Sequence, residues 1–151
     1  MNLKIALAQL FLRLSLGIGF LVPGLDRLGV WGPNGGTNIS WGDWQHFSKY
    51  AHELMFFLPY GIAEVFAIIA TAGELLFGAL LIAGWYTKYA AIGSAILTLC
   101  FALSMAVSSG IVSPLSYSVF TVSAASFLLS TIKEYKWSID EKNANQKSIH
   151  K

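Results

Sequence analysis

Charged residues are scarce in this sequence of 151 residues. Asp, Glu, Lys and Arg together make up 12% of it, whereas average soluble domains contain about 25%. The net charge of +2 is small, and five of the ten basic residues lie from Lys133 onward, which excludes nucleic-acid binding as the main function. Cysteine is nearly absent too, since Cys100 is the single one. One cysteine excludes an internal disulfide framework, a multi-cysteine metal site and a CxxC redox motif.

Apolar residues are abundant instead and account for 55% of the chain. They form four stretches that approach or exceed the ~20 residues needed to cross a bilayer core. The sequence therefore predicts an all-α membrane protein built as a four-transmembrane-helix bundle. We expect the spans at about 3–25, 62–83, 89–107 and 114–132. The fourth is rich in Ser and Thr, and we expect it to face protein over much of its surface.

The segment 40–58, between the first two predicted spans, has the pattern of a short amphipathic helix. Apolar residues such as Phe47 and Leu54 recur at helical spacing, and polar residues such as Lys49 fill the other side. A helix this rich in Trp, Tyr and Phe is typical of the membrane–water interface, where amphipathic rings partition. We expect an extracytoplasmic interfacial helix with Phe47 and Leu54 toward the bilayer.

The basic residues predict the orientation in the membrane. With the amino terminus inside, Lys4, Lys88 and the five lysines from Lys133 onward are cytoplasmic. Only Arg27 and Lys49 are then outside, which satisfies the positive-inside rule. Four spans return the chain to the side on which it started, so both termini are expected in the cytoplasm.

The predicted spans divide the chain into two parts of different character. Residues 1–133 are expected to form a single integral-membrane domain of four helices. Residues 134–151 are polar and lysine-rich, without apolar periodicity, which predicts a polar cytoplasmic tail that frays.

Two ionisable residues, Arg13 and Glu74, fall well within the first and second predicted spans. Each lies about 15 Å from the cytoplasmic end of its span at 1.5 Å per residue, counted from Leu3 and from Gly84. An unpaired charge at that depth costs several kcal/mol. Since consecutive spans are antiparallel neighbours, we expect Arg13 and Glu74 to form an ion pair, and these two are the predicted catalytic residues.

Polar and small residues accompany both charges on the same helix faces. Gln9 and Gly17 lie one turn from Arg13, and Gly78 lies one turn from Glu74. Small residues let backbones approach closely and keep a charge away from lipid. One hypothesis is a pocket that binds a quinone head group, an anion or a proton, with these residues around it. The alternative is a structural ion pair that sets the register of the helices.

A second polar cluster is expected near the outer surface. Arg27 closes the first span and Glu64 opens the second, and we expect an ion pair between them near the mouth of the pocket. His52 is a candidate for assisting proton transfer there, because histidine titrates near neutral pH; the alternative is a solvated polar face. His46 and His52 are six residues apart rather than four, so no metal site is predicted.

Several short motifs, in this order and spacing, resemble the DoxX family of small bacterial membrane proteins. The matching runs are RLSLGIGFL from Arg13, LDRL from Leu25, GELLFG from Gly73, LIAG from Leu81 and SPLSYSVF from Ser113. The resemblance covers roughly residues 5–130, leaves the tail unmatched and implies a four-helix membrane bundle.

The resemblance also implies candidate residues and a setting. The family's motif arginine and glutamate correspond to Arg13 and Glu74, and Arg27 stands where many members carry lysine. Named relatives include the small subunit of a thiosulfate:quinone oxidoreductase, and others are associated with membrane redox or oxidative-stress complexes. A quinone cofactor, a soluble or membrane-bound redox partner and a place in the bacterial cytoplasmic (inner) membrane follow as expectations.

Three functions are therefore weighed. The first is a subunit of a quinone-linked oxidoreductase, in which Arg13 and Glu74 bind the quinone carbonyl and exchange its proton. The sequence shows no haem-ligand pair, flavin motif or redox cysteine pair, so the electrons would come from a substrate or a partner. The second is a non-enzymatic assembly or scaffold protein of the lipid bilayer. The third is a small-solute carrier, which with four spans would need to form a homo-oligomer.

Overall fold

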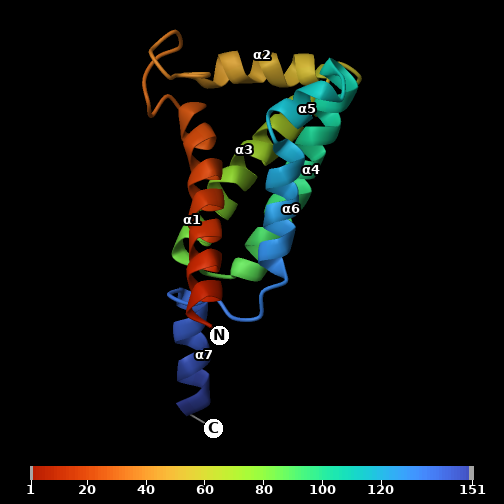
Figure 1. Cartoon of the computed structure of the whole chain (residues 1–151). Helices are drawn as coiled ribbons and strands as arrows, with labels where there is room; N and C mark the ends of the chain where they lie inside the picture. Colours follow the sequence, from red (N-terminus) through yellow and green to blue (C-terminus); the bar gives the residue numbers. More distant parts are fainter. Residues whose placement is uncertain (1, 150–151) are drawn as a thin grey trace.

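The computed structural model describes residues 2–149, which form seven helices and no strand. The helices are α1 (Leu3–Asp26), α2 (Trp44–Leu54), α3 (Tyr60–Ala83), α4 (Thr87–Ser109), α5 (Val112–Ser116), α6 (Val119–Ser130) and α7 (Ile139–Ile149). In Figure 1, α1, α3, α4 and α6 run roughly along one direction and α2 lies across their upper end. The beginning of α1 and the end of α7 lie at the opposite, lower end (Figure 1).

Three of these helices, α1, α3 and α4, are long and apolar enough to cross a membrane. They contain 24, 24 and 23 residues, so each is about 35 Å long at 1.5 Å per residue. That length exceeds the roughly 30 Å of a bilayer's hydrocarbon core. Their positions agree closely with the first three spans expected from the sequence.

The expectation of one continuous helix over 114–132 is wrong. Ser118 adopts a left-handed backbone conformation with φ +56°, and this separates the short α5 from α6. Since α6 has only 12 residues, it is about 18 Å long. This is shorter than the hydrocarbon core, and a fourth crossing of the membrane stays a prediction.

The bundle is assembled through small side chains at its helix crossings. Gly17 of α1 lies against Gly78 of α3 so closely that a Cβ added to Gly78 would stand 2.9 Å from the Gly17 carbonyl oxygen. Between α4 and α6 the contact is made by buried Ala and Ser residues, and the Ser123 hydroxyl donates to the Ala95 carbonyl at 2.8 Å. Small residues and hydroxyl groups of this kind are what bring membrane helices together.

The amphipathic α2 begins at Asp43, whose side chain accepts a hydrogen bond from the His46 amide at 2.9 Å. This bond holds the pKa of Asp43 below its usual value. The apolar face of α2 is not turned to lipid as expected, because Phe47 and Leu54 are buried against the protein. This helix therefore acts as a cover over α3 and α4, while its position at a membrane interface stays a prediction.

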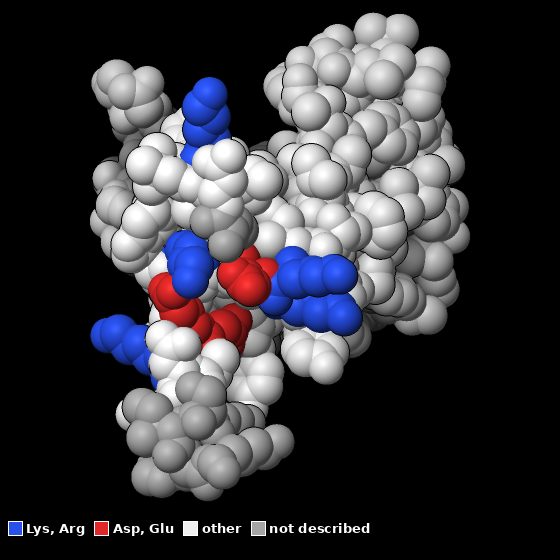
Figure 2. Space-filling model, turned by 60° about the horizontal axis from the view of Figure 1, so that its bottom comes forward, with Lys and Arg blue, Asp and Glu red and all other residues white. Residues whose placement is uncertain are grey.

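The C-terminal segment was expected to fray, but the part of it around residues 135–140 packs against the bundle. Tyr135 is buried and its hydroxyl donates to the Leu129 carbonyl at 3.0 Å. The Asp140 carboxylate accepts hydrogen bonds from the Tyr86 and Thr87 amides at 2.9 and 2.8 Å, and so caps the start of α4. Figure 2 shows acidic and basic side chains gathered at this lower end of the molecule.

Candidate functional site

A buried ion pair joins α3 to the residue that follows α1. Arg27 Nη1 lies 2.7 Å from Glu74 Oε2, and Arg27 Nη2 donates to Glu74 Oε1 at 3.3 Å. Nη1 also donates to the Thr71 hydroxyl at 2.9 Å. The two charged side chains are only 7% and 6% exposed. The Phe47 ring of α2 covers the guanidinium, with its centroid 3.8 Å from the central carbon, so four side chains from three parts of the chain converge here.

The expected partner of Glu74 was Arg13, and the structure corrects this. Because Gly17 and Gly78 meet at the α1–α3 crossing, they set the register of the two antiparallel helices. Arg13 precedes Gly17 by four residues and Glu74 precedes Gly78 by four, in opposite directions along the bundle axis. The eight residues separate the two charges by about 12 Å, and Glu74 therefore meets Arg27.

Arg13 is instead bound by backbone carbonyl groups near the C-terminal end of the chain. Its Nη2 donates to the Trp137 carbonyl at 2.8 Å and its Nη1 to the Lys136 carbonyl at 3.5 Å. Gln9 donates to the same Lys136 carbonyl at 3.0 Å. A Cβ on Gly84, which ends α3 in a left-handed conformation, would stand 2.7 Å from Arg13 Nη1. Arg13 and Gln9 thus form a clasp that holds the C-terminal segment against the bundle.

The same segment carries a half-buried ion pair beside the clasp. Lys136 Nζ lies 2.8 Å from Glu141 Oε1, and the Trp137 amide donates to the other carboxylate oxygen at 2.8 Å. The hydrogen bond from Lys136 holds the pKa of the Glu141 carboxyl below its usual value. These contacts hold residues 136–141 beside the clasp.

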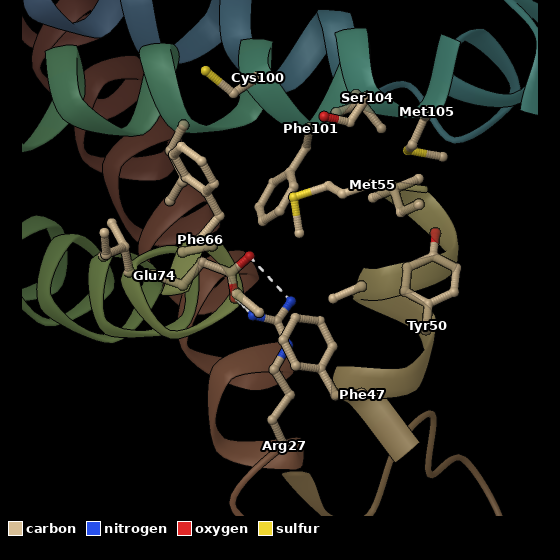
Figure 3. Close-up of a pocket in the computed structure, with 18 of the residues that line it drawn as sticks. Arg27, Phe47, Tyr50, Met55, Phe66, Glu74, Cys100, Phe101, Ser104 and Met105 are labelled. Atoms are coloured by element: carbon tan, nitrogen blue, oxygen red, sulfur yellow. Dashed lines mark hydrogen bonds and ion pairs between the residues drawn. The ribbon is translucent and has the colours of Figure 1, made fainter. Parts of the chain in front are cut away.

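A cavity of about 640 Å³ lies between α2, α3 and α4, with the Arg27–Glu74 ion pair at one end. Figure 3 shows the ion pair facing a wall of apolar side chains. The lining residues labelled there are Arg27, Phe47, Tyr50, Met55, Phe66, Glu74, Cys100, Phe101, Ser104 and Met105. A mostly apolar cavity of a few hundred Å³ with a few convergent polar groups is the usual form of a small-molecule site.

The ion pair retains a donor that no protein atom satisfies. Arg27 Nε is buried and has no hydrogen-bond partner. A buried donor without an acceptor costs about 1–3 kcal/mol, which a ligand carbonyl oxygen at this end of the cavity would recover. The site therefore suits an apolar molecule that carries a hydrogen-bond acceptor.

Glu64 does not pair with Arg27, contrary to expectation, but fastens α2 to α3. Its carboxylate accepts hydrogen bonds from Trp44 Nε1 at 2.9 Å and from the Ser48 hydroxyl at 2.5 Å. His52 Nε2 lies 3.1 Å from the same carboxylate. The three α2 residues are spaced four apart, so they occupy one face of the helix. His52 thus sits at this attachment and not in the cavity.

The structure divides the predicted site residues into separate groups. Arg27 and Glu74 line the cavity, whereas Gln9 and Arg13 form the clasp. Gly17 and Gly78 make the helix crossing, and Glu64 with His52 fastens α2.

Two contributors to the ion-pair site, Phe47 and Thr71, are absent from the sequence-based prediction. The sequence could have indicated Thr71, because a residue three positions before Glu74 lies on the same face of the helix. Phe47 was identified as apolar but was expected to face lipid. Among residues 2–149, no group of three or more His, Cys, Asp or Glu side chains could hold a metal ion.

Comparisons with known proteins are limited to one family. A search of curated proteins and a search of solved structures each return no significant match. The family model described as DoxX matches residues 8–107, a range that contains the crossing of α1 and α3, the ion pair and most of the cavity. Together with three helices able to cross a bilayer, the match makes this a multi-pass membrane protein. The chain belongs to the DoxX family.

Proposed function

We propose that this chain is the quinone-binding subunit of a membrane redox system. The observation that carries the proposal is the position of the buried Arg27–Glu74 pair at one end of an otherwise apolar cavity. A quinone has the matching form, since a ring with acceptor oxygens is its only polar part. When bound, a quinone would supply two-electron redox chemistry, since the addition of two electrons and two protons converts it to a quinol.

The residues of the site have distinct tasks in this proposal. Arg27 donates a hydrogen bond to a ring oxygen and stabilises the negative charge that develops there on reduction. Glu74 stands beside it as a carboxyl group that gives up or accepts a proton. Phe47 stacks on the guanidinium and excludes water from the ion pair. The electrons come from a redox partner or a reduced substrate, because the sequence shows no bound redox centre of its own.

The test compares quinone content in purified protein with and without the ion pair. In the double variant Arg27→Met with Glu74→Leu, both charges are removed at similar volume, so neither is left unpaired. We expect this variant to fold and to lose the quinone that extraction and chromatography find in the unaltered protein. The matched control is Arg13→Met, which removes a buried arginine outside the cavity and should retain the quinone. A folded double variant with full quinone content and full activity would make the pair structural and favour the assembly function.

We also propose four membrane crossings with both termini in the cytoplasm of a bacterial inner membrane. Seven basic residues against two favour this orientation. In a Cys100→Ser background, an impermeant thiol reagent should label a cysteine at Asn38 in intact cells, but not one at Asn143. The reverse labelling would place the cavity in the cytoplasmic half of the membrane.

A further inference from the structure

Protein covers the cavity from above, from below and at the end toward α1. Tyr50 of α2 and Met55, the residue that follows this helix, cover it from above, and the Arg27–Glu74 pair closes the end toward α1. Below, the Phe77 ring fills the space beside Gly93, where an added Cβ would stand 2.4 Å from the ring. The α3 and α4 helices therefore touch below the cavity and leave it no outlet in that direction.

Another side of the cavity lies between α3 and α4. The side chains at this side line the cavity and are also exposed on the outer surface of the bundle. Ile69 of α3 and Ile96 of α4 are 58% and 59% exposed. Phe66 and Cys100 are exposed at the same edges. Since both helices are membrane-crossing, apolar side chains exposed along them face hydrocarbon. The opening thus connects the ion pair to the bilayer interior.

We infer that the ligand enters from the bilayer between α3 and α4 and keeps a hydrocarbon chain in this opening. This inference rests on the proposed function and narrows it to quinones with a tail. The polar end of the cavity holds the ring, and the exposed apolar edges hold the first part of the chain. A quinone without a tail would leave these edges to the lipid and bind more weakly.

A matched pair of adjacent residues tests the route. Ile69 lines the cavity, whereas Ile68 is similarly exposed, at 51%, but does not line it. In nanodiscs, Ile69→Trp should fill the opening and weaken binding of a decyl-tailed benzoquinone about tenfold, since a misplaced large side chain is costly. Ile68→Trp places the same indole in lipid and should bind the quinone as the unaltered protein does. If Ile69→Trp fails to fold, Ile96→Trp blocks the opposite edge.

A photoreactive group maps where the chain lies. A decyl quinone with a diazirine in its tail should crosslink to the α3 and α4 edges, at Phe66, Ile69, Ile96 and Cys100, and excess unmodified quinone should prevent this. Crosslinks to Phe57, in the turn between α2 and α3, would indicate access from the water side and overturn the inference. Crosslinks that added phospholipid removes, but quinone does not, would assign the opening to membrane lipid and overturn it as well.

The two proposals fail in different ways. If no quinone binds and the Arg27→Met with Glu74→Leu variant is indistinguishable from the unaltered protein, the proposed function is wrong. If quinone binding depends on the ion pair, but the Ile69→Trp and Ile68→Trp variants bind equally well, only the route and the tail requirement are wrong.

Discussion

Two buried arginines lie toward opposite ends of the bundle and are stabilised in different ways. Arg27 is 6% exposed and is paired with a carboxylate, Glu74. Arg13 is 1% exposed and donates to the Lys136 and Trp137 carbonyls. The Arg27–Glu74 pair borders a cavity of about 640 Å³. Arg13 instead holds the C-terminal segment against the bundle. Burial of the same residue type therefore accompanies a cavity at one end and a clasp at the other.

The difference teaches how to interpret a charge inside a membrane helix. Such charges are functional candidates by default, and in the sequence Arg13 meets that criterion, whereas Arg27 follows the first predicted span. What separates them is the space around the guanidinium group, since the Nε atom of each arginine is buried without a hydrogen-bond partner. Arg27 lines a cavity, while the hydrogen bonds of Arg13 go to a segment packed directly on it.

The largest effect is expected from breaking the Arg27–Glu74 pair on one side. Arg27→Met leaves the Glu74 carboxylate buried without its partner, which should destabilise the fold by about 3–5 kcal/mol. Folded yield and unfolding in mixed micelles measure this. Adding Glu74→Leu should restore most of the loss, since no charge then remains. A single variant as stable as the unaltered protein would mean that Glu74 finds another partner or is not buried in the membrane.

A smaller loss is expected at the clasp. Arg13→Met removes a charged donor from two backbone carbonyls and should cost about 2–3 kcal/mol. Hydrogen exchange should rise in residues 133–141, while the amides around Glu74 stay protected and quinone binding persists. Exchange that rises equally around both arginines would remove the distinction between a clasp and a site.

The sequence was sufficient to locate the long helices and the charged residues buried between them, but not the pairing of those charges. Apolar runs predicted α1, α3 and α4 to within about two residues at each end, because a bilayer imposes both length and composition. The pairing of Glu74 failed for a geometric reason. Depth counted from helix ends assumes that the ends are level, whereas Gly17 and Gly78 set a different register between α1 and α3.

Two other features lay beyond the sequence pattern. The break at Ser118 depends on a left-handed residue that is not glycine, which no periodicity signals. Phe47 of α2 faces the protein because its ring packs on the Arg27 guanidinium group. An amphipathic helix next to a membrane has the same pattern whether its apolar face meets lipid or protein.

Weakening the attachment of α2 to α3 should change the stability of the protein only at the end of the bundle that contains the cavity. Glu64→Gln removes the negative charge that accepts from Trp44 and Ser48, and hydrogen bonds to charged groups are the stronger ones. We expect local stability of α2 to fall by about 1 kcal/mol, seen as faster amide exchange there and weaker quinone binding. The control is Glu53→Gln on the exposed side of α2. Equal effects of the two variants would show that lost charge, and not the attachment, loosens α2.

The smallest effect is expected at Tyr135, beside the clasp. Its hydroxyl donates to the Leu129 carbonyl, which also accepts from the Ile132 amide, so Tyr135→Phe leaves no carbonyl unsatisfied and should cost less than about 1 kcal/mol at neutral pH. Burial raises the pKa of Tyr135 from 10.0 to about 12, so the unfolded chain ionises first as the pH rises. The stability that neutral Tyr135 contributes is thus complete below pH 10 and lost toward pH 12. Thermal unfolding of Tyr135→Phe should be less sensitive to pH across this window than that of Tyr89→Phe, which removes an exposed phenol. Equal alkaline sensitivity in the two variants would mean that the C-terminal segment is already released from the bundle below pH 10.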